Sequence, residues 1–170
     1  FRYATTDPGT CSDAFGTRTP SSSISDQNLG NGSSAVAYSR AIGSLTPATT
    51  YYFCAIARNG YGTSYGAILS LTTPPAAPTV TTNFPTALTG TTGTLSGTVN
   101  PGGDATIGWF RYHTSSPGTC NDSFGTRAPA AGGNALGSGI TSTALTQMVT
   151  GLSPGATYYV CAFAMNSVGT

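Results

Sequence analysis

The segment that decides the fold is ATYYVCAFAMNSVGT, residues 156–170, in which the side chains alternate along the chain. Successive side chains of a β-strand point to opposite faces of a sheet. The even-numbered positions from 158 to 164 (Tyr, Val, Ala and Ala) therefore share one face, and the odd-numbered positions from 159 to 163 (Tyr, Cys and Phe) share the other. This alternation, in a run rich in aromatic residues, predicts a strand whose even-numbered positions face a core.

The same pattern occurs a second time in the chain. Residues 49–63 read TTYYFCAIARNGYGT and match residues 156–170 at nine of fifteen positions. Residues 1–20 (FRYATTDPGTCSDAFGTRTP) and residues 110–129 (FRYHTSSPGTCNDSFGTRAP) are identical at 14 of 20 positions. The offsets of 107 and 109 residues are those of a whole repeated domain and are too long for the unit of a solenoid.

A proline-rich joint separates the two copies. Residues 64–109 occur once and contain TPPAAP at residues 73–78, which is typical of a short stiff linker. We therefore expect residues 1–74 to be the C-terminal part of one domain and residues 75–170 to be a second domain that lacks its last strand. Because a partial domain cannot cover its own core, upstream sequence or a neighbouring chain is expected to supply the missing strands.

The charged residues argue against several classes of function. The chain has six Arg and five Asp but no Lys and no Glu, and its net charge of +1 provides no basic face for nucleic acid. Without Lys there is no Schiff-base or P-loop chemistry, and without Glu the commonest catalytic carboxylate pairs are missing. His113 is the single histidine, and the Asp residues do not cluster. We expect no catalytic residues, no metal site and no cofactor.

The remaining composition favours an all-β protein. More than half of the residues are Gly, Ala, Ser or Thr, which can indicate disorder, but disordered chains have few aromatic residues and 10% of this chain is aromatic. Short strands containing Thr, Tyr and Val, separated by Gly and Pro turns, are typical of all-β folds. No apolar run approaches the ~20 residues needed to span a membrane.

Both copies contain a Leu-x-Pro motif, then a tyrosine, then Ala-x-Asn-x-x-Gly, and this order resembles the fibronectin type III family. The resemblance implies tandem immunoglobulin-like β-sandwiches, as in large secreted or surface bacterial proteins. It also implies that Tyr51 and Tyr158 are tyrosine corners, whose hydroxyl groups bond to the backbone just upstream. One departure is Trp109, because the family's usual tryptophan lies on an earlier core strand, whereas Trp109 lies on the next strand and faces away from the core. The matching residues are Leu45, Pro47, Tyr51, Ala57, Asn59 and Gly62 in the first copy, and Leu152, Pro154, Tyr158, Ala164, Asn166 and Gly169 in the second.

Each copy has two cysteines at equivalent positions, Cys11 and Cys54 in the first and Cys120 and Cys161 in the second. Among the three possible pairings, this equivalence favours one disulfide within each copy, Cys11–Cys54 and Cys120–Cys161. Metal binding is disfavoured because there is no Cys-x-x-Cys pair. Disulfides require an oxidising compartment, so we expect the protein to be extracellular or on a cell surface.

The strand register predicts what these disulfides do. Cys54 and Cys161 fall on the outward face, so each bond is expected to hold a loop, residues 8–18 or 117–127, over the outside of one sheet. Each loop carries a phenylalanine that is expected to pack on outward aromatic residues. These phenylalanines are Phe15 and Phe124. The ion pairs expected within the loops are Asp13–Arg18 and Asp122–Arg127.

The outward aromatic residues have two interpretations. If they are exposed, they form a ligand face on which sugar rings stack. If the loop covers them, they form a small second core, which is the interpretation we favour. The residues of this face are Trp109, Arg111, Tyr159 and Phe163.

Together these features predict a structural or adhesive repeat region of an extracellular protein, such as a stalk, an adhesin or a filament subunit, and not an enzyme. The near-identical copies, the proline-rich joint, the low charge and the lack of a site unique to one copy favour this function. The expected partners are other copies of the chain or neighbouring repeats, and not nucleic acid. The alternative is a carbohydrate-binding accessory module of a secreted hydrolase, with a surface polysaccharide as partner.

Overall fold

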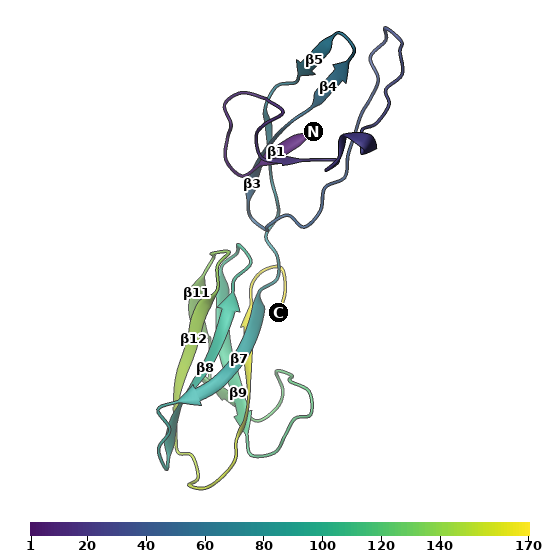
Figure 1. Ribbon diagram of the computed structural model, residues 1–170. Coiled ribbons are helices and arrows are strands. Elements are labelled where there is room, and N and C mark those ends of the chain that lie inside the picture. Colours follow the sequence, from purple (N-terminus) through teal and green to yellow (C-terminus); the bar gives the residue numbers. More distant parts are fainter. The chain divides into compact units, whose positions relative to one another are not determined.

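The computed structural model describes residues 1–170, and every regular element but one is a β-strand (Figure 1). The exception is the single-turn 3-10 helix η1 (Ser23–Ser25). All strand pairings are antiparallel, so the predicted all-β class is confirmed. The chain forms two compact units, Phe1–Thr73 (unit 1) and Pro74–Thr170 (unit 2).

Unit 2 contains two sheets. The first has the order β12-β8-β7. The second has β9 at its centre, with β10 and β11 along one edge of β9 and β13 along the other. The strands are β7 (Thr79–Thr86), β8 (Thr92–Asn100), β9 (Thr106–His113), β10 (Thr126–Ala128), β11 (Asn134–Gly137), β12 (Thr143–Thr150) and β13 (Tyr159–Met165) (Figure 1).

The core of unit 2 draws side chains from both of its sheets. The sequence TGTLSGTV of residues 92–99 alternates and predicts that Leu95, Gly97 and Val99 share one face. Strand β8 has this alternation, because every second residue from 93 to 99 is buried. Phe110 and Leu145 are fully buried and face this core from β9 and β12. Burying one such side chain stabilises a fold by about 1.5–3 kcal/mol relative to leaving it exposed. The buried core residues are Leu95, Val99, Phe110, Ala128, Leu145, Val149, Ala162 and Ala164.

Unit 1 has one larger sheet of order β2-β1-β3-β6 and a separate hairpin formed by β4 and β5. Strands β1 and β3 correspond in sequence to β9 and β13 of unit 2. The strands are β1 (Arg2–Ala4), β2 (Thr17–Arg18), β3 (Thr50–Cys54), β4 (Ile56–Asn59), β5 (Gly62–Tyr65) and β6 (Leu69–Thr72).

Unit 1 has no counterpart of the β12-β8-β7 sheet. Phe1 is therefore only half-buried, whereas its equivalent in unit 2, Phe110, has no exposed surface. Ala55 and Ala57 are exposed, although their equivalents Ala162 and Ala164 lie in the core of unit 2. The repeat predicts that these two alanines face the core side of the sheet, and in unit 1 they are exposed because no second sheet covers that side.

The TPPAAP segment lies between β6 and β7, and all of it except Thr73 belongs to unit 2. The amide of Ala76 donates to the carbonyl of Gly102 at 2.8 Å. The Asn166 side-chain amide donates to the carbonyls of Ala76 at 2.8 Å and Pro101 at 3.0 Å. The asparagine of the Ala-x-Asn-x-x-Gly motif thus attaches the end of the linker to unit 2.

No helix in the protein has the length and apolar character needed to cross a membrane.

Candidate functional site

Each unit contains one disulfide. The bonds are Cys11–Cys54, with Cα atoms 6.1 Å apart, and Cys120–Cys161, with Cα atoms 5.9 Å apart, and no cysteine is free. These are the pairs that the repeat favoured. Cys54 and Cys161 are almost completely buried, although their side chains point away from the face that carries Phe110. Each bond therefore connects a loop to the outside of a sheet.

In unit 2 the pinned loop covers a second hydrophobic cluster. Trp109 and Phe163 are 4% and 9% exposed, and their rings stack with centroids 5.8 Å apart. Phe124 of the loop packs against this cluster together with the Cys161 sulfur. Strand β9 is thus buried on both faces, with Phe110 in the main core and Trp109 beneath the loop.

Polar contacts lie at the solvent-exposed edge of this cluster. The Asp122 carboxylate accepts hydrogen bonds from Trp109 Nε1 at 2.6 Å and from Arg111 Nε at 2.9 Å. Arg127 does not pair with Asp122 as the sequence predicted. Its guanidinium lies over the Trp109 ring, 4.7 Å from the ring centroid, and donates to the carbonyl of Pro129. The expected Asp122–Arg127 pair is therefore wrong, because Arg111 on β9 reaches the carboxylate and Arg127 stacks on the indole.

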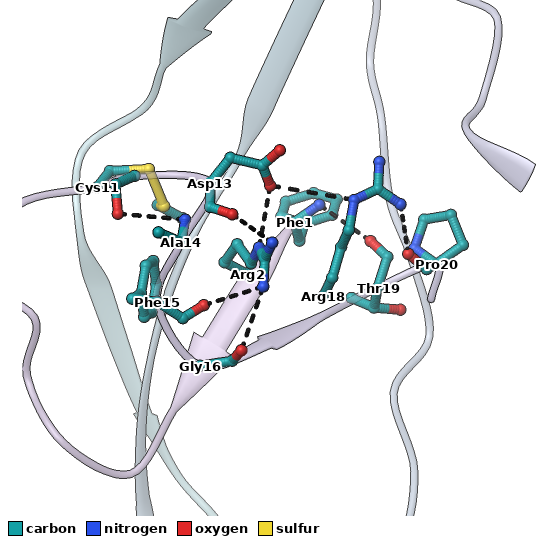
Figure 2. Close-up of polar contacts among 12 residues, drawn as sticks. Phe1, Arg2, Cys11, Asp13, Ala14, Phe15, Gly16, Arg18, Thr19 and Pro20 are labelled. Atoms are coloured by element: carbon teal, nitrogen blue, oxygen red, sulfur yellow. Dashed lines mark hydrogen bonds and ion pairs between the residues drawn. A yellow bond between two sulfur atoms is a disulfide. The ribbon is translucent and has the colours of Figure 1, made fainter. Parts of the chain in front are cut away.

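Unit 1 has the equivalent arginine–aspartate contact at its disulfide loop, as Figure 2 shows. Arg2 Nε donates to the Asp13 carboxylate at 3.0 Å. The expected Asp13–Arg18 ion pair is also present, with Arg18 Nε 4.0 Å from the same oxygen. Arg2 also donates to the carbonyls of Phe15 at 3.3 Å and Gly16 at 3.2 Å. Arg2 and Arg111 are thus equivalent anchors, each extending from a central strand to its loop.

One glycine in each loop is required by this close approach. Gly16 and Gly125 have positive φ angles of 50° and 54°. A Cβ atom at Gly125 would collide with the carbonyl oxygen of Tyr112 and lie 2.8 Å from the Cβ of His113. Gly16 meets the equivalent atoms of unit 1, so both copies use glycine to bring the loop onto the strand.

The environment of Asp122 lowers the pKa of its carboxyl group. Burial raises the pKa of Asp122, but the hydrogen bonds from Arg111 and Trp109 outweigh burial, and the net pKa lies below the usual value of an aspartate. In unit 1 the hydrogen bond from Arg2 likewise lowers the pKa of Asp13. A carboxylate with a lowered folded-state pKa stabilises the fold above its unfolded-state pKa, and this stabilisation is lost as the pH falls through the folded-state pKa.

We expect unit 2 to lose stability as the pH falls from about 5 to about 2, and an Asp122→Asn variant to lose less over the same interval. The variant should be less stable than the wild type near neutral pH and approach it at the acidic end. Denaturant titrations followed by the fluorescence of Trp109, the single tryptophan, measure this difference. Asp13→Asn is the matched control in unit 1. If this control flattens the pH dependence of the Trp109 transition as much as Asp122→Asn does, the assignment to Asp122 is incorrect.

Both tyrosines at the expected corners bond to the backbone upstream. The Tyr51 hydroxyl accepts from the amide of Thr46 at 2.9 Å, and the Tyr158 hydroxyl accepts from the amide of Ser153 at 3.1 Å. Each bond spans five residues and fixes the segment that enters the strand. A hydrogen bond of this kind contributes about 0.5–1.5 kcal/mol to stability.

The predicted ligand face is not an open platform. Trp109 and Phe163 are buried beneath the loop, and Arg111 is held by Asp122. Only Tyr159 keeps a substantial exposed fraction, 44%. A sugar ring therefore cannot stack on the indole while the loop is closed.

Two features of the structure concern metal and ligand binding. No group of three His, Cys, Asp or Glu side chains lies close enough to hold a metal ion. Unit 1 has an open hollow of about 450 Å³ near η1. Two of its lining residues, Arg18 and Asp26, form an ion pair at 2.7 Å, so their charges are already compensated.

No protein-family model, curated protein or solved structure matches this chain.

Proposed function

We propose that the chain is a structural or adhesive repeat region of an extracellular or cell-surface protein, built from tandem fibronectin type III-like β-sandwiches with one disulfide each. The two sheets of unit 2 around a single core support this architecture. The bonds of Tyr51 and Tyr158 to the upstream backbone support it as well, because they have the geometry of tyrosine corners. The two disulfides are consistent with an oxidising extracellular environment.

The observation that supports this proposal most strongly is that the repeated polar and aromatic residues close the disulfide-pinned loops. In both copies the arginine of the Phe-Arg-Tyr motif holds the aspartate of a disulfide-pinned loop. The side chains with the greatest capacity to bind a ligand are thereby used to close the outer face. Such closure increases resistance to local opening and proteolysis, as a stalk, an adhesin or a filament subunit requires.

The binding partners that we propose are inferred from the same features. Neighbouring repeats or other copies of the chain are the partners that a repeated, weakly charged module favours. The net charge of +1 and the pairing of Arg2 and Arg111 with aspartates disfavour nucleic acid as a partner. The proposal includes no catalytic activity and no cofactor.

Immunogold electron microscopy of intact cells, with antibodies raised against the chain, tests the location and the role. We expect gold particles on filaments, stalks or the outer surface. Label confined to the cytoplasm would contradict the proposal.

A carbohydrate-binding accessory module is the second candidate, supported by the exposed ring of Tyr159. Binding to insoluble cellulose and chitin separates the two functions. The architectural proposal expects the chain to remain in the supernatant. Saturable retention that is abolished by Tyr159→Ala would favour the carbohydrate module.

A further inference from the structure

We propose that Asn31 in unit 1 is a site of spontaneous modification, at which the asparagine is converted to aspartate and isoaspartate without an enzyme. Asn31 is followed by Gly32, and the chain contains one other Asn-Gly pair, Asn59-Gly60. The reaction requires the backbone nitrogen of the following residue to reach the asparagine side chain. Because glycine has no Cβ and few conformational restrictions, this approach is least hindered in an Asn-Gly pair.

The conversion takes place in two steps, and water is the only other reactant. First, the deprotonated backbone nitrogen of Gly32 attacks Cγ of Asn31 and forms a C–N bond that closes a succinimide ring. The bond from Cγ to the side-chain nitrogen breaks, and this nitrogen leaves as ammonia with the proton that the Gly32 amide gave up. Water then opens the ring at one of its two carbonyl groups, which yields aspartate or isoaspartate. No atom is oxidised or reduced.

The segment that contains Asn31 is open to solvent. Asn31, Gly32 and Ser33 are all exposed, and they belong to no helix or strand. A Cβ atom placed at Gly32 would meet no atom within 4 Å. The backbone nitrogen of Gly32 and Cγ of Asn31 therefore have room to approach each other.

Unit 2 shows that this exposure is a property of the repeat. The sequence LGNG at residues 29–32 corresponds to LGSG at residues 136–139, with the offset of 107 residues. The first glycine of each segment has a positive φ angle, 81° in unit 1 and 77° in unit 2. In unit 2 the segment leads from β11 into the turn before β12, and Ser138, the equivalent of Asn31, is exposed. We therefore place Asn31 in an exposed turn of the repeated fold.

The second Asn-Gly pair is held in a hairpin. Asn59 ends β4 and pairs with Gly62 of β5. Its side-chain oxygen accepts hydrogen bonds from the amides of Tyr61 at 2.9 Å and Gly62 at 3.2 Å. These bonds and the strand pairing restrict the movement that brings Cγ of Asn59 onto the backbone nitrogen of Gly60. The hairpin must open before Asn59 reacts, so the two pairs differ in structure although their sequences are the same.

The modification has a large effect on the charge of the chain because the chain has few charged residues. Each conversion adds one carboxylate and lowers the net charge at pH 7 from +1 to zero. Proteins without net charge associate more readily. Conversion therefore favours contacts between copies of the chain, a consequence that rests on the proposed architectural function, whereas the modification itself does not.

Incubation of the full 170-residue chain at mildly alkaline pH tests the inference. Mass spectrometry of peptides released by pepsin at acidic pH, where the reaction is slow, measures conversion at each asparagine. We expect Asn31 to react at least about tenfold faster than Asn59, because only Asn59 requires opening of the hairpin. The rate at Asn31 should rise with the hydroxide concentration, and isoelectric focusing should show a matching shift to the acidic side. In the reduced chain in denaturant the two rates should become similar.

Two glycine variants are the matched controls. Gly32→Ala should slow the reaction at Asn31, whereas Gly60→Ala should leave it unchanged, and both place a Cβ atom in open space. Equal rates at Asn31 and Asn59 in the folded chain, or an Asn31 that stays intact, would overturn the inference. A glycan on Asn31 in native material would also overturn it, because Asn-Gly-Ser is an acceptor sequence for N-linked sugar. None of these results changes the outcome of the immunogold test.

Discussion

Replacing Cys120 and Cys161 together with serine is expected to lower the free energy of unfolding of unit 2 by about 4 kcal/mol. The bond joins residues 41 positions apart, so its loss greatly increases the conformational freedom of the unfolded chain. It also releases the loop that covers Trp109 and Phe163. We therefore expect the tryptophan emission of the folded variant to shift to the red as the indole gains contact with water.

Denaturant titration followed by Trp109 fluorescence measures both effects. The Cys11→Ser/Cys54→Ser variant is the matched control, because it removes the equivalent bond, between residues 43 positions apart, from unit 1. This control should leave the Trp109 transition near its wild-type midpoint. If the Cys120/Cys161 variant unfolds at the wild-type midpoint with unchanged emission, the disulfide does not hold the loop.

Phe110→Ala is expected to destabilise unit 2 by about 3–5 kcal/mol. The ring has no exposed surface and packs among side chains of both sheets, so its removal leaves a cavity that the surrounding strands fill only in part. Phe84→Ala makes the same change at a ring that is 92% exposed in the same unit. This second variant should lie within about 0.5 kcal/mol of the wild type.

The comparison is again followed by Trp109 fluorescence during denaturation, with circular dichroism to confirm that both variants retain strand structure. Phe110→Ala should either unfold at a much lower denaturant concentration or fail to fold, while Phe84→Ala folds normally. Equal midpoints for the two variants would show that the two sheets do not share the core described here.

The features that could be predicted from sequence are those that depend on local periodicity and on the repeat. The alternation of residues 92–99 predicts the buried face of β8, and the repeat favours the cysteine pairs that are bonded. The odd-numbered register of Cys161 correctly predicts that the disulfide loop lies over the outer face and covers Trp109. Each of these inferences needs only the direction of side chains along one strand.

The features that could not be predicted depend on which segments meet in space. The sequence gives no reason to prefer Arg111 to Arg127 as the partner of Asp122, since both recur in each copy and both lie within reach of the loop. In the structure the Arg127 guanidinium stacks on the Trp109 ring, and Arg111 contacts Asp122 from the central strand β9.

The recurring loop gives the proposed architecture a physical basis. In a chain with few charges and small side chains, a single core per domain leaves one sheet face open to water. The disulfide, the Arg–Asp contact and the loop glycine close that face with residues present in both copies. In unit 2 the central strand β9 thus has two buried layers of side chains, which is consistent with the proposed architectural role.

Electron microscopy of the native material, at a resolution that traces the chain, tests this account most directly. We predict an ordered filament or stalk of repeated units, in which residues 117–127 cover Trp109. Separate, flexible units with Trp109 and Phe163 exposed to solvent would contradict the architectural role and make sugar binding the better explanation.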